Sequence, residues 1–544
     1  MSSSISCNDL TFVWPDGTVV LDGVDLSVGP GRTGLIGVNG SGKSTLLKLI
    51  AGELRPTRGA VAVSGALACL PQHLPLDADC RIDAVLGIAE VRSALRAAEA
   101  GQVTERHLAT IGDDWDIEQR ARATLDRLGL VHVGLDRTVG AVSGGESVLL
   151  GLAALFLQRP DVLLLDEPTN NLDLRARERL YQAVAAYRGV LVVVSHDRRL
   201  LEQVDQIVDL RDHDVRVYGG DLTDYEQTVA REQAAAERMV RVAHADVRRQ
   251  RRELIDARVK LDRRLRAARK AEAEKRVPRI VAQARKREAQ VSAGKLRDLH
   301  IDRVATAEAS LAQAMQALRS DDEIRVDLPE TVVPSRRTVV VCEAVDVAPP
   351  LWEQPVDVAL RGPERVALVG VNGAGKTTLL RMIAGELAPA TGTVRVGVNG
   401  VRYLPQRLDV LDDAHSVLDN ARRYATSAAP NDLRARLARF NFRAGRADQL
   451  AGALSGGERF RAVLATLLSA EPPPHLLLLD EPTNSLDSAS VRQLQQALRA
   501  YRGALVVASH DLPFLQAIGT TRWLQLDRAT GLEEVDVASL AQLR

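Results

Sequence analysis

The feature that most restricts the possible folds is an internal repeat of five short motifs, in the same order in both halves of the chain. Asp166 precedes His196 by 30 residues, and Asp480 precedes His510 by the same interval. Repeats at this scale indicate duplicated domains, so we predict two domains of one fold within the 544 residues. The first copies are Gly37–Thr45, Leu70–Gln72, Ser143–Glu146, Leu165–Asn170 and Ser195–Asp197, and the second copies are Gly370–Thr378, Leu404–Gln406, Ser455–Glu458, Leu479–Asn484 and Ser509–Asp511.

The first motif is a glycine-rich loop between a strand-like stretch and an apolar stretch that predicts a helix. Glycines allow successive backbone amides to face one anion, and the following helix adds the positive end of its dipole. We expect Lys43 and Lys376 to reach the β- and γ-phosphates, and the hydroxyls of Ser44 and Thr377 to coordinate Mg²⁺. The expected nucleotide-binding residues of these loops are Asn39, Gly40, Ser41, Gly42, Lys43, Ser44 and Thr45, and then Asn372, Gly373, Ala374, Gly375, Lys376, Thr377 and Thr378.

An apolar strand that ends in Asp-Glu follows the loop in each half. A buried strand of this kind brings its first carboxylate, Asp166 or Asp480, to the metal ion. The adjacent Glu167 or Glu481 is then placed to polarise the water that attacks the γ-phosphate. A glycine-rich turn before a helix is common by itself, but together with this strand it predicts two ATP-hydrolysing α/β domains with ATP and Mg²⁺ as cofactors.

These motifs resemble those of the ATP-binding cassette superfamily over nearly all of both halves. The resemblance implies that Gln72 and Gln406 touch the metal and the attacking water, and that His196 and His510 contact the γ-phosphate. Both histidines also follow valine-rich strands, at whose carboxyl ends open α/β sheets bind ligands. The third motif resembles the signature that completes the ATP site of the opposite cassette. Its residues are Ser143, Gly144, Gly145 and Glu146 in the first copy and Ser455, Gly456, Gly457 and Glu458 in the second.

The two halves differ in the aromatic residue that this superfamily places before the glycine loop to stack on adenine. Trp14 stands 23 residues before Gly37, at the place that the resemblance assigns to this residue. The second cassette has no aromatic residue near Val347, and Trp352 is the only nearby candidate although it aligns poorly. Recognition of adenine is therefore expected in the first site.

The signature helices also differ, because Glu458 is followed by Arg-Phe-Arg whereas Glu146 is followed by Ser-Val-Leu. The helix after the first signature therefore lacks two cationic side chains. We expect the site that contains Lys376 to be the slower of the two, since it borrows the first signature.

A segment of different character, residues 224–326, separates the predicted cassettes at 1–223 and 327–544. Its apolar residues recur every seven positions on two stretches, which indicates an antiparallel helical hairpin with a first arm of roughly 40 residues. The first cassette also has about 22 more residues than the second between its second and third motifs, and we place this short insertion at 88–116. The predicted fold is α/β, with two P-loop ATP-binding cassette domains joined by a long antiparallel helical hairpin linker.

The net charge of zero conceals a basic linker, because residues 231–320 contain 24 Lys and Arg against 12 Asp and Glu. Such a cluster at the predicted turn is typical of contact with RNA phosphates. A solvated coiled coil with ion pairs along each helix is the alternative interpretation. Residues 231–320 contain no Phe, Tyr or Trp, which favours contacts with the RNA backbone over base stacking. The expected RNA contacts are Arg263, Arg264, Arg266, Arg269, Lys270, Lys275, Arg276, Arg279, Arg285 and Lys286.

Three classes of cassette ATPase could have this organisation: a transporter motor, a DNA-repair ATPase and a ribosome-bound translation factor. The sequence has no run of 18 apolar residues that could cross a membrane. It also has no signal-like start, and its four cysteines contain no Cys-x-x-Cys pair, which together indicate the cytoplasm. Repair ATPases of this type usually split one cassette with a very long coiled coil or insert zinc modules, and neither pattern fits.

The tandem cassettes, the short insertion and the linker of about 100 residues resemble the ATP-binding cassette F family. The resemblance implies a monomeric ATPase, with its own two cassettes paired, that binds the ribosome at the tRNA exit site. Its linker would reach ribosomal RNA and the peptidyl-site tRNA, and the protein would either modulate translation or protect the ribosome from antibiotics. The alternative is a soluble ATPase subunit of a membrane transporter.

Overall fold

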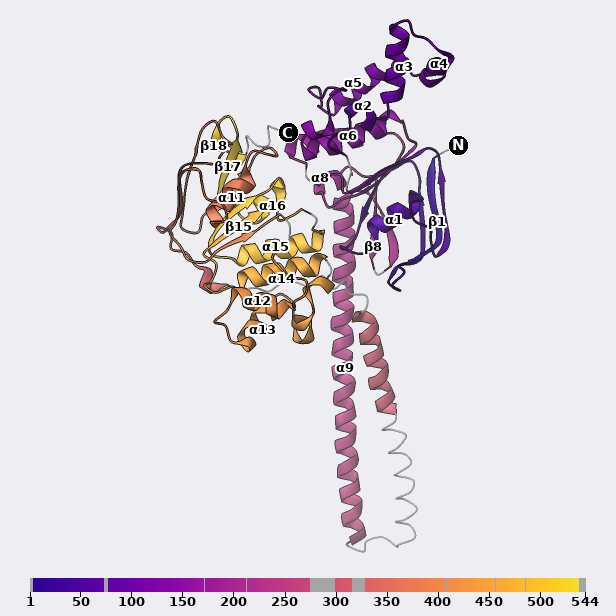
Figure 1. Ribbon diagram of the computed structural model, residues 1–544. Helices are drawn as coiled ribbons and strands as arrows, with labels where there is room; N and C mark the ends of the chain where they lie inside the picture. The colour runs from indigo at the N-terminus through magenta and orange to yellow at the C-terminus, as the bar shows by residue number, and fades with distance from the viewer. Residues whose placement is uncertain are drawn as a thin grey trace. The chain divides into compact units, whose positions relative to one another are not determined.

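The computed structural model describes residues 3–72, 77–170, 172–211, 213–273, 299–315, 328–406, 409–454, 456–484 and 486–537 (Figure 1). The chain forms two compact units. One contains residues 1–222 and 322–544, with both repeats, and the other contains residues 223–321. Among the helices of the described ranges, none is both long and apolar enough to cross a membrane.

The first cassette contains two sheets. Their strands are β1 Ser4–Val13, β2 Val19–Val28, β3 Gly31–Ile36, β4 Arg58–Ser64, β5 Leu67–Leu70, β6 Val162–Asp166, β7 Val190–Val194, β8 Gln206–Arg211 and β9 Asp214–Gly219. The larger sheet has the order β5-β6-β7-β3-β8-β9, and all neighbours in it are parallel except β8 and β9. The smaller, antiparallel sheet has the order β2-β1-β4. Strands β6 and β7 are buried along their whole length, as expected of apolar strands inside a parallel sheet.

Helices cover the first cassette and extend it. They are α1 Lys43–Ile50, α2 Ile82–Val85, α3 Ala89–Glu99, α4 Glu105–Ile111, α5 Ile117–Arg127, η1 Val139–Ala141, α6 Gly144–Leu157, α7 Leu174–Ala186 and α8 Arg198–Leu201. Segment 88–116 contains α3 and α4, which pack against each other. The guanidinium of Arg92 on α3 donates to Asp83 of α2 at 2.8 Å, to Asp136 at 2.8 and 2.9 Å, and to Glu118 of α5. One buried arginine thus links α3 to two neighbouring helices.

The second cassette repeats this plan without counterparts of α3 and α4. Its strands are β10 Thr338–Asp346, β11 Val356–Arg361, β12 Arg365–Val369, β13 Thr391–Val396, β14 Val401–Leu404, β15 Leu476–Asp480, β16 Ala504–Ala508, β17 Arg522–Asp527 and β18 Gly531–Glu534. Their order is β14-β15-β16-β12-β17-β18 in the larger sheet and β11-β10-β13 in the smaller one. The helices are η2 Pro329–Thr331, α11 Lys376–Ala384, α12 Val417–Tyr424, α13 Pro430–Ala438, η3 Ala444–Asp448, η4 Ala451–Ala453, α14 Gly456–Leu468, α15 Ser488–Ala500 and α16 Leu512–Ala517.

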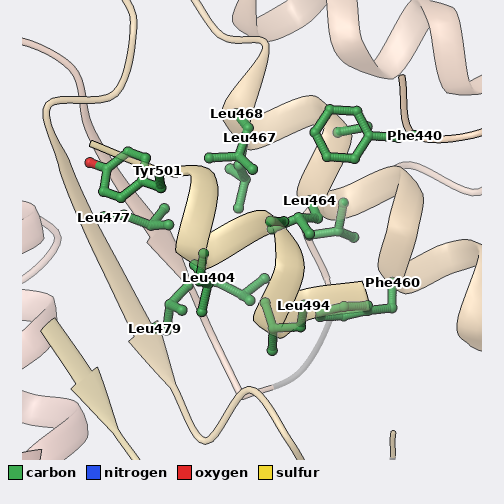
Figure 2. Packing of buried hydrophobic residues seen from close by; sticks show 14 of the residues in the cluster. Leu404, Phe440, Phe460, Leu464, Leu467, Leu468, Leu477, Leu479, Leu494 and Tyr501 are labelled. Atoms are coloured by element: carbon green, nitrogen blue, oxygen red, sulfur yellow. The ribbon is translucent and has the colours of Figure 1, made fainter. Parts of the chain in front are cut away.

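A hydrophobic core holds the larger sheet of the second cassette against α14 and α15 (Figure 2). Leu477 and Leu479 point from β15 toward Leu464 of α14 and Leu494 of α15, and none of these four side chains is exposed. Burying each such side chain contributes about 1.5–3 kcal/mol. The core therefore fixes the carboxyl end of β15, where Asp480 lies.

The unit of residues 223–321 is helical in its described part. Helix α9, Leu222–Ala273, has 52 residues and is about 78 Å long at the usual rise per residue. Residues 299–315 form a second helix that returns alongside it (Figure 1). Val247, Ala307 and Ala314 are buried in this unit, and Arg251 Nη2 lies 2.6 Å from Glu308 Oε1 across the pair.

The predicted fold class is confirmed: the chain has two α/β cassette halves with a helical insert between them. The first arm of the linker is longer than the predicted 40 residues, because the helix runs unbroken from the end of the first cassette. The basic turn around Pro278 lies outside the described residues.

Candidate ATP sites at the carboxyl ends of the sheets

The repeated motifs meet at one edge of each larger sheet. In the first cassette, β3, β6 and β7 are parallel neighbours, so their carboxyl ends lie together. The glycine loop follows β3, Asp166 is the last residue of β6, and Ser195 and His196 follow β7. β12, β15 and β16 place the second copies in the same way. This edge is where open α/β sheets bind ligands.

The lysine of each glycine loop is buried and turned back onto its own loop. Lys43 Nζ donates to Gly37 O at 2.8 Å and to Val38 O at 3.2 Å, and Lys376 Nζ donates to Gly370 O at 2.7 Å. Both lysines stand at the first position of their helix, α1 or α11. Each ammonium group therefore lies inside the loop, where the amides and the helix end favour an anion.

The glutamates that follow β6 and β15 are held in an unusual conformation. Glu167 and Glu481 have φ values of 48° and 47°, which non-glycine residues rarely adopt. Glu167 N donates to Val194 O at 2.9 Å, and Glu481 N donates to Ala508 O at 2.8 Å, so the neighbouring strand fixes each turn. Backbone strain of this kind is concentrated at functional sites.

Burial favours the protonated form of these two glutamates. It raises the pKa of Glu167 to about 8 and that of Glu481 to about 7, while the positive charge of Lys43 or Lys376 acts in the opposite direction. A carboxyl group with a pKa near neutrality is suited to accept a proton from water. The arrangement can therefore support general-base chemistry.

A neutral histidine lies beside each glutamate. His196 Nε2 is 3.3 Å from Glu167 Oε1, and His510 Nε2 is 3.4 Å from Glu481 Oε1. Burial lowers the pKa of His196 to about 3 and that of His510 well below its ordinary value. In the second site, His510 Nε2 also lies 3.1 Å from Lys376 Nζ and 3.3 Å from Asn372 Oδ1. Each imidazole is thus positioned to hydrogen bond a phosphate oxygen held by the loop.

The candidate metal ligands of the second site lie together. Tyr403 Oη donates to Asp480 Oδ2 at 3.2 Å, and Thr377 also hydrogen bonds with Asp480. The described residues contain no group of three or more His, Cys, Asp or Glu side chains able to hold a metal ion. One carboxylate with one hydroxyl fits Mg²⁺, which prefers oxygen ligands and keeps water and phosphate oxygens in its shell. Asp166 and Ser44 occupy the same places in the first cassette.

The glutamines of the second motif follow the edge strand of each sheet. Leu70 pairs with Leu165, so Gln72 stands just beyond the end of β5, next to the strand that ends in Asp166. β14 places Gln406 beside Asp480 in the same register. Both glutamine residues are exposed. Either side chain can therefore approach a ligand from the open side of the site.

The first signature caps its helix with a reciprocal pair of hydrogen bonds. Ser143 Oγ accepts from Glu146 N at 3.3 Å, and Glu146 Oε2 accepts from Ser143 N at 2.7 Å. Gly144 and Gly145 form the first turn of α6 between them. His132 Nε2 lies 2.7 Å from the other carboxylate oxygen of Glu146.

In the second signature, Gly456, Gly457 and Glu458 form the first turn of α14, and Ser455 lies outside the described residues. Arg459 anchors this turn through Asp413. The first signature has Ser147 at the corresponding position, where the hydroxyl donates only to Ser143 O at 3.1 Å.

Contacts between the cassettes reach both glycine loops. Asn39 N donates to Asp487 Oδ2 at 2.9 Å, and Asn372 N is 3.5 Å from Asp173 Oδ2. A Cβ atom at Gly456 would lie 3.6 Å from Asn39 Cβ, so the second signature lies against the first loop. Each ATP site is therefore bordered by residues of the other cassette.

Asp173 and Asp487 are not among the site residues expected from the sequence. Each caps the helix that follows its Asp-Glu motif, since Asp173 Oδ1 accepts from Ala176 N and Asp487 Oδ1 accepts from Ser490 N. The signal was present in the repeat, because a Leu-Asp pair stands at the same distance after the motif in both halves.

The structure explains why the aromatic residues of the two cassettes did not align. Asp9 in β1 and Ala344 in β10 both have a positive φ, and each lies at a bulge of its strand. When the two bulges are aligned, Trp14 in the first cassette corresponds to Pro349 in the second. Trp14 is 39% exposed and packs edge-on against Phe12, with 4.9 Å between ring centroids.

Trp352 has a different role. It is buried under the second loop, where its Nε1 donates to Ala374 O at 2.8 Å. A Cβ atom at Gly375 would lie 2.7 Å from the ring of Trp352, and one at Gly42 would lie 2.4 Å from Val20 Cγ1. The ring of Trp352 thus packs against the second glycine loop at the place where Val20 packs against the first.

The expected RNA-contacting residues of the linker are described only in part. Arg263 and Arg266 are exposed on α9. Arg264, Arg269 and Lys270 lie on the same helix, but their side chains are outside the described part. Five further candidates lie wholly outside the described residues, namely Lys275, Arg276, Arg279, Arg285 and Lys286.

Comparison with known proteins places these sites in a family. The model of the ABC transporter family matches residues 21–170 and 354–484. The tylosin resistance ATP-binding protein TlrC of Streptomyces fradiae is 34% identical over 94% of this chain and 95% of its own length. The probable ATP-binding protein YheS of Escherichia coli K12 is 31% identical over 94% of this chain and 77% of its own length. The ABC transporter F family member 2 of Arabidopsis thaliana is 29% identical over 92% of this chain and 74% of its own length.

The chain belongs to the ATP-binding cassette F family. Its cassettes bind ATP, and as a member of this family the protein is an ATPase. The fold is also that of the archaeal ribosome recycling factor aABCE1, solved in complex with the ribosomal stalk protein aP1, with a TM-score of 0.52 over 98% of this chain and 92% of that chain. The sequences are 18% identical, so this similarity concerns the fold alone.

Proposed function

We propose that this ATP-binding cassette F protein is a cytoplasmic factor that binds the ribosome at the tRNA exit site. Through its linker it would modulate translation or protect the ribosome from an antibiotic. The observation that carries the proposal is the match to the tylosin resistance protein TlrC, which extends through both cassettes and the linker and covers 95% of that protein. A helical unit inserted between two cassettes has no evident use in an ATPase that only powers a transporter.

We propose that both sites hydrolyse ATP with Mg²⁺. The lysines of the glycine loops would bind the β- and γ-phosphates, and Asp166 and Asp480 would hold the metal with Ser44 and Thr377. The metal ion would neutralise phosphate charge when bound. Glu167 and Glu481 would act as general bases. As the family resemblance implies, His196 and His510 would contact the γ-phosphate, and Gln72 and Gln406 would touch the metal and the water.

The described part of the linker supports an RNA contact. Small side chains such as Ala307 and Ala314 are buried where the two helices meet, which leaves the long basic side chains outside. Arg263 and Arg266 are exposed toward the tip of α9. Arginines on a helix surface bind phosphates without reading sequence, and that contact depends on salt.

Co-sedimentation with ribosomes tests the proposed partner. In a Glu167→Gln, Glu481→Gln double variant, ATP should remain bound without hydrolysis and hold the cassettes together. We expect this variant to pellet with ribosomes when ATP is present and to remain in the supernatant without ATP. A variant that stays soluble with ribosomes and ATP, but binds membranes, would instead support the transporter alternative.

Charge reversal tests the linker separately. Arg263→Glu with Arg266→Glu should lower the ribosome-stimulated ATPase rate and leave the basal rate unchanged, because the glycine loops are untouched. Arg238→Glu with Arg241→Glu is the matched control, since both residues are exposed on the same helix near its start. Equal loss of basal and stimulated rates would assign the linker a structural role.

Expression in a tylosin-sensitive host distinguishes antibiotic protection from a general effect on translation. We expect the natural chain to raise the inhibitory concentration of tylosin, and the Glu167→Gln, Glu481→Gln variant to lose this effect. An unchanged inhibitory concentration together with ATP-dependent ribosome binding would support translation control and exclude protection against this antibiotic.

A further inference from the structure

Arg177, on the first turn of α7, has a position that neither the repeat nor the family motifs mark. Its Nε donates to Leu172 O at 3.1 Å, and its Nη1 donates to Asp197 Oδ2 at 3.3 Å. Its side chain is 14% exposed and that of Asp197 is 8% exposed. This guanidinium therefore joins the loop before α7 to the segment that follows β7.

The two ends of this link belong to different ATP sites. Asp197 directly follows His196 of the first site. Leu172 directly precedes Asp173, whose carboxylate lies 3.5 Å from the amide of Asn372 in the second glycine loop. Asn372 Oδ1 in turn lies 3.3 Å from His510 Nε2.

Other contacts place the start of α7 at the second cassette. Leu174 packs against the hydrophobic core of the second cassette. The charge of Arg177 also reaches the second site, where it acts with Lys376 to lower the pKa of Glu481 against the larger opposing effect of burial.

The repeat breaks at this position. Helix α15 of the second cassette begins after Asp487 as α7 begins after Asp173, and the residue that corresponds to Arg177 is Val491. The side chain of Val491 packs into the core of its own cassette and has no group that can hydrogen bond. In the first site Asn39 N likewise donates to Asp487, but the position that corresponds to Arg177 holds the apolar Val491.

We propose that Arg177 is a positioning residue of the second ATP site, supplied by the first cassette, and that it couples His196–Asp197 of the first site to Asp173 at the second glycine loop. The coupling has one direction, because the second cassette has no equivalent of this arginine. It goes beyond the proposed ribosome function and depends only on ATP hydrolysis by the two sites.

Site-isolated variants of the full chain provide the test. Glu167→Gln leaves the second site as the hydrolysing one, and Glu481→Gln leaves the first. In the Glu167→Gln background, Arg177→Val should lower kcat about tenfold and change KM less than about twofold, because Lys376 and its loop still bind the nucleotide. In the Glu481→Gln background the same change should alter kcat less than about twofold, since Tyr181 Oη still holds Asp197 at 2.7 Å.

Two further variants separate positioning from packing. Arg177→Lys retains a cation near Asp197 and should restore at least about half of kcat at the second site. Arg175→Val is the matched control on an exposed position of the same turn and should change neither site. An Arg177→Val effect of equal size in both backgrounds, or one that lysine does not relieve, would overturn the proposal.

A double-mutant cycle tests the coupling itself. Asp197→Asn keeps the helix cap at α8, where Leu200 N donates to the Asp197 side chain, and removes the charge that faces Arg177. If the two residues act through each other, the double variant should lose no more kcat at the second site than the more impaired single variant. Losses that multiply would show independent roles and would contradict the coupling.

Discussion

At the scale of single residues, the two cassettes differ in the residue at the position expected to stack on adenine. Trp14 is partly exposed in the first cassette, and Pro349 takes its place in the second. Stacking of a base on an aromatic ring contributes about 1–3 kcal/mol. Trp14→Ala should therefore raise KM for ATP about tenfold or more at the first site, measured in the Glu481→Gln background, and leave the second site unchanged.

Pro349→Trp is the reciprocal change and should lower KM at the second site. Trp115→Ala serves as the control, because Trp115 is 57% exposed in the same cassette but lies between α4 and α5. Unchanged KM values in the Trp14 variant would show that this ring does not contact the nucleotide.

The residues that the sequence revealed and those it missed differ in how their positions are determined. Lys43 stands at a fixed place in a strand–loop–helix motif, and Asp166 and Glu167 stand at the end of a buried strand, so each motif alone places its residues. The register of Trp14 depends on a bulge at Asp9, and an aspartate there gives no sign of its positive φ. Arg177 matters through contacts with distant segments, and no local pattern reports such contacts.

At the scale of secondary-structure elements, the signature helices α6 and α14 are not equivalent. Arg459 anchors the start of α14 through Asp413, whereas α6 has Ser147 at that position. We expect the second site, which the family resemblance pairs with the first signature on α6, to turn over several-fold more slowly. The kcat of the Glu167→Gln variant should thus be below that of the Glu481→Gln variant, and Ser147→Arg should reduce the difference. Equal rates in the two single variants would remove the basis for this asymmetry.

The helices around segment 88–116 depend on one buried arginine. Arg92 is 5% exposed, and its removal would leave Asp83, also 5% exposed, without its partner on α3. Arg81 would still donate two hydrogen bonds to Asp83, so the cost should be below that of an uncompensated buried charge, about 3–5 kcal/mol. Arg92→Met should therefore increase hydrogen exchange in α2, α3 and α5, whereas Arg96→Met should have little effect because Arg96 is 53% exposed.

The same network should weaken in acid. The arginines Arg81 and Arg92 hold the pKa of Asp83 below its ordinary value despite its burial. A lowered pKa stabilises the folded state above the unfolded value of about 4, and this stability is lost as the pH falls through the folded pKa. Protection of the α3 amides, corrected for the intrinsic pH dependence of exchange, should fall at low pH, and protection that does not fall would contradict the role of this carboxylate.

At the scale of the whole molecule, the repeated part and the inserted part form separate compact units. Charge follows the same division, since residues 231–320 have twice as many basic as acidic residues in a chain of zero net charge. The cassettes contain the chemistry, and the motifs made that part of the fold predictable. The linker contains no repeat of those motifs, so only its heptads and its charge indicated a helical unit for a polyanionic partner.

This division predicts how ATP should stabilise the protein. A ligand that binds only the folded state adds about 4 kcal/mol when its concentration is a thousand times Kd. Both sites lie in the cassette unit, so ATP with Mg²⁺ should slow hydrogen exchange in β3 and β12 of the Glu167→Gln, Glu481→Gln variant. Exchange in α9 should remain as it is without ATP if the linker, a separate compact unit, opens independently of the cassettes. If α9 gained protection in parallel with β3, the two units would have to unfold together, and the linker could not respond to a partner independently of the cassettes.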